Sequence, residues 1–176
     1  LEEFSRMSRM VSDMLFLAQA DNNQLIPEQQ ALDLAEEVHK VFEFFEAWAE
    51  EKAVALRFVG SHCRVMGDPL MLRRAISNLL SNAIRYTPAG QAVTIQLSES
   101  AETIRLVVEN PGTPIAAEHL PRLFDRFYRV DPSRQRKGEG SGIGLAIVKS
   151  IVSAHHGSVA VQSDRRSTRF IVVLPK

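Results

Sequence analysis

Two asparagines lie four residues apart in a segment that has the pattern of a helix. Asn78 and Asn82 fall within residues 69–86, so they share one helix face, and Arg85 and Tyr86 follow one turn later. The apolar residues form a different stripe, made of Leu72, Ile76, Leu79, Leu80 and Ala83. Because asparagine is a mediocre helix former, the polar face has two interpretations: solvated amides, or ligands for a bound group.

A glycine-rich run stands where a loop turns into a helix. It reads Gly138-Glu139-Gly140-Ser141-Gly142-Ile143-Gly144-Leu145. Glycines let the backbone approach an anion closely, and a helix N-terminus offers free N–H groups. No Gly-Lys-Ser/Thr follows and no strand leads directly into the run, so it is neither a Walker loop nor a dinucleotide fingerprint. Taken alone, the run would equally suit a flexible hinge.

Composition narrows the class of protein. The 176 residues suffice for one well-buried domain and a short appendage. Lysine plus arginine and aspartate plus glutamate both number 21, a balance without the basic surplus of a nucleic-acid-binding protein. The single cysteine, Cys63, excludes an internal disulfide framework. The chain opens on Leu1 rather than methionine, so we expect a piece of a longer protein, and the lack of a span of roughly 20 apolar residues says little about that protein.

The elements that must position these residues follow from periodicity. The first twenty or so residues predict one amphipathic helix, whose apolar stripe needs a partner helix. The stripe consists of Phe4, Met7, Met10 or Val11, Met14, Leu15, Leu17 and Ala18. Asp21-Asn22-Asn23 ends this helix, and we place a domain boundary near Ile26, which divides the chain into 1–26 and 27–176.

The second part alternates between helical and extended patterns. Helices are predicted at 34–51, 69–86 and 141–155, and Asp68-Pro69 is a strong start signal for the second. Strands are predicted at 31–34, 54–59, 64–66, 93–97, 103–108, 158–162 and 169–174. Residues 110–140 carry little regular pattern. The several hairpins favour an α/β (α+β) sandwich over a doubly wound sheet.

Four strings occur in a fixed order along the chain: NLLSNAIRYTP, ENPGTP, LFDRFYR and GEGSGIGLAIVK. They resemble the N, G1, F and G2 boxes of sensor histidine kinases of two-component systems, most of all the copper- and silver-sensing group. The resemblance covers about residue 28 to the end. Residues 1–22 resemble the end of the second helix of the dimerisation and phosphotransfer hairpin. The family implies the Bergerat ATP-binding fold, a mixed, largely antiparallel five-stranded sheet packed on about three helices, with ATP and Mg²⁺ as cofactors.

The resemblance also assigns roles. Asn82 matches the asparagine that binds magnesium, Asn78 a residue near the γ-phosphate, and Arg129 an arginine that reaches the terminal phosphate from the lid. Arg85 matches a phosphate-contacting basic residue, and Tyr86 one that packs against the adenine. Phe124 and Phe127 resemble anchors of the lid. The remaining nucleotide-binding positions implied are Asn110, Gly112, Ile115, Phe124, Gly140, Ser141, Gly142, Ile143, Gly144 and Leu145.

The G1 string departs from the family pattern. Asn110 stands where the family has an aspartate that accepts a hydrogen bond from the adenine amino group, and Pro114 replaces a glycine. An amide oxygen can still accept that bond, but without negative charge. We therefore expect adenine affinity to be lower by up to roughly tenfold, and Asn110→Asp to tighten ATP. Ser167 likewise replaces a frequent glycine, in a turn.

Three alternatives remain open. An ATPase of the same fold would carry a glutamate as general base at the position of Asn78, which cannot take a proton at neutral pH. A metal-binding module is suggested by His62-Cys63 and His155-His156, although neighbouring residues point apart and no ligand spacing recurs. A nucleotide-binding pseudokinase that only scaffolds is the third, and Asn82 and Arg129 argue against it.

No histidine of the chain lies in the His-Glu/Asp-x-x-x-Pro setting of a phosphoacceptor. We therefore expect the acceptor on a helix outside this chain, and no autophosphorylation by the chain alone. The resemblance implies that the partners are the kinase's own dimerisation and phosphotransfer domain, in a homodimer, and the receiver domain of a response regulator, with no nucleic acid. It places the parent protein at the cytoplasmic face of the bacterial inner membrane, anchored by a membrane segment.

Overall fold

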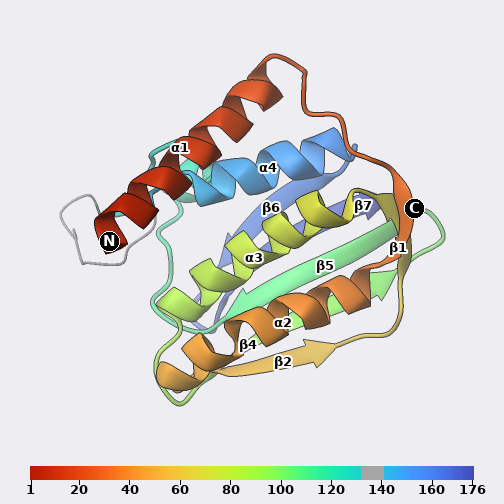
Figure 1. The fold of residues 1–176 in the computed structure, drawn as a ribbon. Helices are drawn as coiled ribbons and strands as arrows, with labels where there is room; N and C mark the ends of the chain where they lie inside the picture. The colour runs from red at the N-terminus through yellow and green to blue at the C-terminus, as the bar shows by residue number, and fades with distance from the viewer. Residues whose placement is uncertain (132–140) are drawn as a thin grey trace.

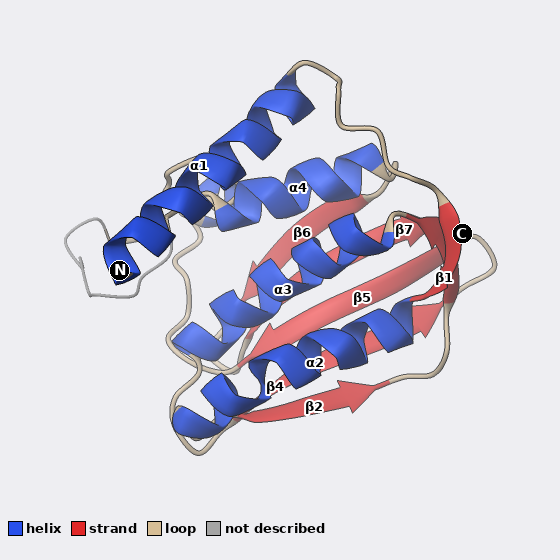
Figure 2. Cartoon of the chain, in the orientation of Figure 1, coloured by secondary structure: helices blue, strands red, loops and turns tan. Residues whose placement is uncertain are grey.

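The computed structural model describes residues 1–131 and 141–176, which form a sheet covered on one face by a layer of helices (Figures 1 and 2). The helices are α1 (Glu2–Asp21), α2 (Leu34–Glu51), α3 (Pro69–Tyr86), α4 (Gly144–Ala154) and a 3-10 turn at Leu120–Arg122. The strands are β1 (Gln30–Asp33), β2 (Ala55–Val59), β3 (Arg64–Gly67), β4 (Ala92–Glu99), β5 (Thr103–Asn110), β6 (Ser158–Ser163) and β7 (Thr168–Pro175).

Five strands make the main sheet in the order β2-β4-β5-β7-β6. Only β2 and β4 run parallel, while the other neighbouring pairs are antiparallel. Helices α2, α3 and α4 lie on one face of this sheet, and β1 and β3 form a separate two-stranded ribbon (Figure 1). The predicted sandwich, with a mixed and largely antiparallel five-stranded sheet on three helices, is confirmed.

Alternation along β5 shows why the helices cover this face. Ile104, Leu106 and Val108 are buried there, and the apolar stripe of α3 packs against them. Asp68 caps α3 as predicted, because its carboxylate accepts hydrogen bonds from the N–H groups of Leu70 and Met71 at 3.0 and 3.1 Å. The core thus fixes the rotation of α3 about its own axis, and with it the direction of the asparagine face.

A buried ion pair joins α2 to α3. The Glu37 carboxylate, which is 4% exposed, meets Arg73 at 2.8 Å and Lys40 at 3.2 Å. Burial by itself would raise the pKa of Glu37, but the hydrogen bonds from Arg73 and Lys40 outweigh it and lower that pKa. The same reasoning applies to Asp33, which caps α2 and also pairs with His62: hydrogen bonds hold its pKa below the ordinary value in spite of burial.

Helix α4 begins three residues later than the sequence predicts. The predicted start was Ser141, whereas the first helical residue is Gly144. Gly142 has φ +76°, which a right-handed helix cannot contain, so the chain turns there before the helix begins. The other predicted helices, and the strands to within one or two residues at an end, agree with the observed elements.

Helix α1 has two apolar faces rather than one stripe. Leu17 is buried, and Met10 and Phe16 pack with it against the main domain, where α1 lies across α4 (Figure 1). A second set stays exposed: Phe4, Met7, Val11, Met14 and Leu15. The sequence predicted that Leu17 belongs to the same stripe as these residues. In the structure Leu17 is buried, whereas the others are exposed. The exposed set is the part of the predicted stripe that the rest of the described chain does not cover.

Two ion pairs attach α1 to the main domain. Asp13 meets Arg74 of α3 at 2.5 Å, and the same guanidinium lies 4.4 Å from the ring of Phe16. Near the end of α1, Asp21 meets Arg126 at 2.5 Å, and this hydrogen bond lowers the pKa of the Asp21 carboxyl. Among the described residues, no helix combines the length and the apolar character needed to cross a membrane.

Candidate nucleotide site

The polar face of α3 runs toward the N-terminus of α4. The Asn78 amide nitrogen donates a hydrogen bond of 3.1 Å to the carbonyl oxygen of Gly144. Asn82, one turn later and partly buried, makes no side-chain hydrogen bond within the described part of the chain. Tyr86 lies one turn further on and is 58% exposed. These three residues form a line along α3 that starts at the beginning of α4.

At the other end of that line, the chain leaving β5 presses against α3. Gly112 has φ +139°, and a Cβ built on it would lie 2.7 Å from the carbonyl oxygen of Tyr86. Only glycine permits this approach, so the G1 glycine predicted from the sequence has a physical reason. Asn110 and Gly112 are thereby brought beside the C-terminal turn of α3.

The side chain of Asn110 has a defined orientation. It is 5% exposed, and its amide nitrogen donates a hydrogen bond of 2.9 Å to the carbonyl oxygen of Pro111. Its amide oxygen has no partner within the residues that the structure describes. An open acceptor at the end of β5 is the group that an exocyclic amino group of a base requires.

A backbone hydrogen bond joins the residues on either side of the part of the chain that the sequence predicts to form the lid. The N–H of Phe127 donates to the carbonyl oxygen of Gly142 at 2.9 Å, and both residues have positive φ, +62° and +76°. Phe124 packs edge-on against Phe170 of β7, with ring centroids 6.1 Å apart. Packing of the aromatic ring is therefore a sufficient reason for a phenylalanine at position 124. It is not one for Phe127, because that residue is 53% exposed and its contact with Gly142 is made by the backbone.

The partly buried Arg129 follows this anchor. The residue before it, Tyr128, is fixed by its hydroxyl, which lies 2.5 Å from Nδ1 of His119, and by the guanidinium of Arg122 over its ring. Arg129 and Arg85 both take part in interactions of their own, so neither is a free cation. Gly140 lies outside the described residues, so its predicted role in the lid is not placed.

The first turn of α4 offers backbone groups rather than side chains. Ile143, at the N-cap position, provides no side-chain cap and is fully buried, and Leu145 packs on the core. Both were predicted as nucleotide-binding residues; the Ile143 side chain is buried, so Ile143 can face a ligand only through its backbone, whereas the Leu145 side chain is partly exposed. Ser141 is partly buried just before the turn. Uncapped N–H groups at a helix N-terminus suit an anion.

Two residues near this site were missed by the sequence reasoning. Thr168 begins β7 opposite Asn110, and Ser163 ends β6 opposite Thr168. The N–H of Ile115, a predicted contact residue, donates to the Ser163 hydroxyl at 2.9 Å. The string STRF contained a signal for Thr168, since this polar residue stands just before the apolar residues of the last strand. The register that brings Thr168 and Ser163 beside Asn110 spans three strands, and periodicity cannot predict it.

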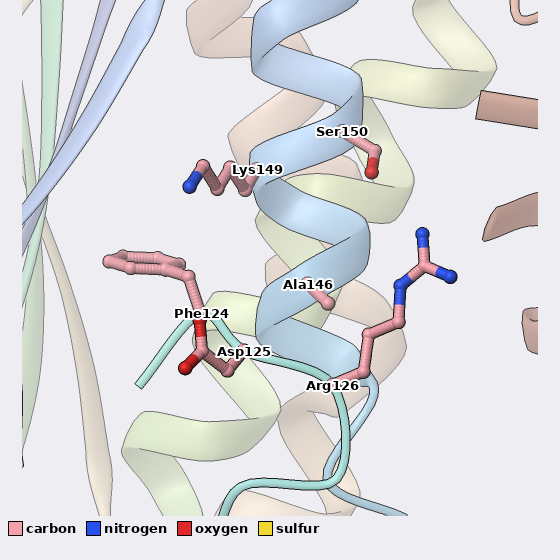
Figure 3. Close-up of a pocket in the computed structure, with 6 residues that line it drawn as sticks. All are labelled: Phe124, Asp125, Arg126, Ala146, Lys149 and Ser150. Carbon is pink, nitrogen blue, oxygen red and sulfur yellow. The ribbon is translucent and has the colours of Figure 1, made fainter. Parts of the chain in front are cut away.

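A hollow of about 400 Å³ lies between the loop at 124–126 and α4, and the residues that line it do not include the asparagines (Figure 3). Phe124, Asp125 and Arg126 line it from the loop, and Ala146, Lys149 and Ser150 line it from α4. Figure 3 shows the ring of Phe124 and the guanidinium of Arg126 pointing to opposite sides. Arg126 is the residue that pairs with Asp21 of α1, so this hollow belongs to the junction with α1.

The histidine and cysteine pairs have structural surroundings. Nε2 of His155 accepts a hydrogen bond of 3.0 Å from the N–H of Asp68, and Nδ1 lies 2.7 Å from the carbonyl oxygen of Ile151. This arrangement needs the neutral ring with its proton on Nδ1. Burial raises the pKa of the Cys63 thiol. No group of three or more histidine, cysteine, aspartate or glutamate side chains able to hold a metal occurs in the described ranges.

Comparison with known proteins places this geometry in a family. Residues 67–176 match the family described as "Histidine kinase-, DNA gyrase B-, and HSP90-like ATPase". The sensor histidine kinase CusS of Escherichia coli K12 is 71% identical over 175 residues, which are 99% of this chain and 36% of CusS. The probable sensor kinase SilS of Salmonella typhimurium is 64% identical over 180 residues, which cover the whole chain and 36% of SilS.

The solved structure of the histidine kinase AdeS of Acinetobacter baumannii superimposes with a TM-score of 0.86 at 24% identity, over 99% of this chain and 81% of that one. At that identity the likeness concerns the fold. The chain spans little more than a third of the length of the two curated relatives named above, 36% in each case.

Proposed function

Because the chain belongs to the family of histidine kinase-, DNA gyrase B- and HSP90-like ATPases, as the catalytic ATP-binding domain of a sensor histidine kinase, we propose that it binds Mg²⁺-ATP along the polar face of α3. The adenine lies at the Asn110 and Gly112 end. The phosphates lie at the end where Asn78 meets the first turn of α4.

One observation carries this proposal: the polar face of α3 is bounded at one end by the chain at Gly112 and at the other end by the N-terminus of α4. From Asn78 to Tyr86 the helix rises by about 12 Å. Gly112 presses on the Tyr86 end, and Gly144 receives the Asn78 amide at the opposite end. A nucleoside triphosphate laid along α3 meets an amide acceptor at its base and backbone N–H groups at its phosphates.

The residues present fit a magnesium ion held mostly by its nucleotide. Asn82 offers one neutral oxygen, and its amide makes no other hydrogen bond within the described part of the chain. Mg²⁺ keeps several waters and phosphate oxygens around it and needs few protein ligands. When bound, the ion neutralises charge on the phosphates. Asn82 would hold it, and Arg129 would face the terminal phosphate from the lid.

The chemistry proposed is transfer of the γ-phosphate rather than hydrolysis. Asn78 occupies the position from which a hydrolase would activate water, and an amide cannot accept the proton. Its nitrogen already donates to Gly144, so the residue ties the phosphate end of α3 to α4. Positioning and charge stabilisation are the main requirements of phosphoryl transfer, and these residues supply both.

The wider assignments are proposals for the longer protein. We propose that residues 1–26 belong to the dimerisation and phosphotransfer hairpin and that residues 27–176 form the catalytic domain. The acceptor histidine lies on that hairpin, and a response regulator takes the phosphate from it. The likeness to CusS and SilS supports a role in copper or silver response and a parent protein anchored in the inner membrane.

The test is calorimetric titration with ATP, with and without Mg²⁺, together with transfer of labelled phosphate to an added dimerisation domain that carries its histidine. We expect Asn82→Ala to weaken Mg²⁺-ATP by at least about tenfold and to abolish transfer. Asn22→Ala, an exposed asparagine at the end of α1, is the matched control. Unchanged magnesium dependence in Asn82→Ala would refute the magnesium assignment, and rapid phosphate release by the chain alone would favour an ATPase.

A further inference from the structure

Three short polar side chains form one row across the end of the main sheet. Asn110 of β5 lies opposite Thr168 of β7, and Thr168 lies opposite Ser163 of β6. Directly opposite residues of antiparallel strands point to the same face. The next row inward, two residues away on each strand, is Val108, Phe170 and Val161, and it lies in the core under the helices. The core face therefore changes from apolar to polar at the row beside Gly112.

The row is closed by a chain of hydrogen bonds. The N–H of Ile115 donates to the Ser163 hydroxyl oxygen at 2.9 Å, and that oxygen lies 2.8 Å from the Thr168 hydroxyl oxygen. Thr168 is 6% exposed. A serine hydroxyl has one hydrogen and two acceptor sites. Either hydroxyl can be the donor between Ser163 and Thr168. In the direction from Ser163 to Thr168, Ser163 still accepts from Ile115 and the Thr168 hydrogen is left for a neighbour.

We propose that Ser163 is a positioning residue for base selection: it holds the chain that follows Gly112 through Ile115 and turns Thr168 into a hydrogen-bond donor beside the open acceptor of Asn110. This inference rests on the proposed function and names the determinant of base choice within it. The Asn110 oxygen and the Thr168 hydroxyl then form an acceptor and donor pair. Adenine presents the complementary pair, its amino group as donor and its N1 as acceptor.

The reversed polarity distinguishes adenine from a base of the same shape. Hypoxanthine carries a carbonyl oxygen in place of the amino group and a hydrogen on N1, so both of its groups oppose the pair in the protein. Inosine triphosphate is thus a probe that differs from ATP only at this edge. Its affinity relative to that of ATP measures the polarity of the row directly.

The experiment compares the affinities of ATP and inosine triphosphate for the wild-type chain and for Ser163→Ala. We expect Ser163→Ala to weaken ATP about three- to tenfold and to leave inosine triphosphate much less affected, so that discrimination falls. Ser163→Thr keeps the hydroxyl and restores discrimination. Ser158→Ala, the same substitution at the exposed start of β6, leaves both affinities unchanged.

An equal loss for both nucleotides, or no loss for either, overturns the inference, because a purely structural role does not depend on base polarity. If Ser163→Ala does not fold, Thr168→Val removes one hydroxyl with little change of shape and must lower discrimination; unchanged discrimination in that variant overturns the inference as well. Failure of the proposed function has a different signature: the wild-type chain then binds neither nucleotide, or binds ATP with no dependence on Asn82.

Discussion

Replacing Gly112 by alanine tests the contact that shapes the base end of the site. The substitution adds a single methyl group, which would lie 2.7 Å from the carbonyl oxygen of Tyr86. A residue other than glycine at positive φ costs about 1–2 kcal/mol. Relief of the contact adds about 1–3 kcal/mol, since backbone rather than a flexible side chain must move. We expect the free energy of unfolding to fall by about 2–5 kcal/mol in total.

Gly90 provides the matched control. It also has positive φ, +85°, but a Cβ built on it meets nothing within 4 Å. Gly90→Ala should therefore lower the free energy of unfolding by about 1–2 kcal/mol only. In a chain of this size each kcal/mol moves the unfolding midpoint by about 2–4 °C. Thermal unfolding of the two variants consequently compares a positive-φ glycine that contacts α3 with one that contacts nothing.

Nucleotide titration completes this prediction. Movement of the chain at Gly112 displaces Asn110 and weakens ATP, whereas Gly90→Ala leaves ATP affinity unchanged. Equal unfolding midpoints for the two variants, with equal ATP affinities, would show that the G1 glycine is not required by its approach to α3.

Three further predictions concern groups described above. Because the folded-state pKa of Glu37 is lowered, its contribution is present above the ordinary value of 4.5 and is lost as pH falls through the folded pKa; Glu37→Gln should destabilise the chain near pH 6, and its difference from the wild type in denaturant titrations should shrink as the pH falls through that folded pKa. His155→Phe should lower the free energy of unfolding by about 1–3 kcal/mol at pH 7, because the Asp68 N–H is left without its acceptor, and a wild-type midpoint would contradict this role. Asn110→Asp should tighten ATP by less than about tenfold and lower the unfolding midpoint, since a carboxylate cannot donate to Pro111; calorimetry with thermal unfolding checks both.

Periodicity and capping were sufficient for most of the fold. Asp68-Pro69 begins α3, and the strands predicted at 103–108 and 169–174 form β5 and β7. The predicted start of α4 was wrong because the sequence does not reveal which glycine of the run takes positive φ. In the structure it is Gly142. A sequence pattern reflects contacts between residues that are close together in the chain. The conformation of Gly142 instead depends on its contact with Phe127, fifteen residues earlier.

The candidate site likewise contains residues that the sequence could predict and residues that it could not. Asn78 and Asn82 follow from helical spacing, because a helix fixes the angle between residues four apart. Ser163 and Thr168 do not, because they reach the row of Asn110 only through strand pairing. The split of α1 into a packed face and an exposed face depends likewise on α4, which lies far away in the sequence. Tertiary pairing is the information that a linear pattern lacks.

The backbone hydrogen bond between Phe127 and Gly142 has a consequence for how the domain can vary. It joins two parts of the chain that are already held in place, one by the packing of Phe124 on Phe170 of β7 and the other by α4. Closing a loop twice as long requires only about 0.6 kcal/mol more. A change in the length of chain between these two anchored ends is therefore expected to alter the stability of the domain by little. The domain can change how it encloses a ligand without first having to fold differently.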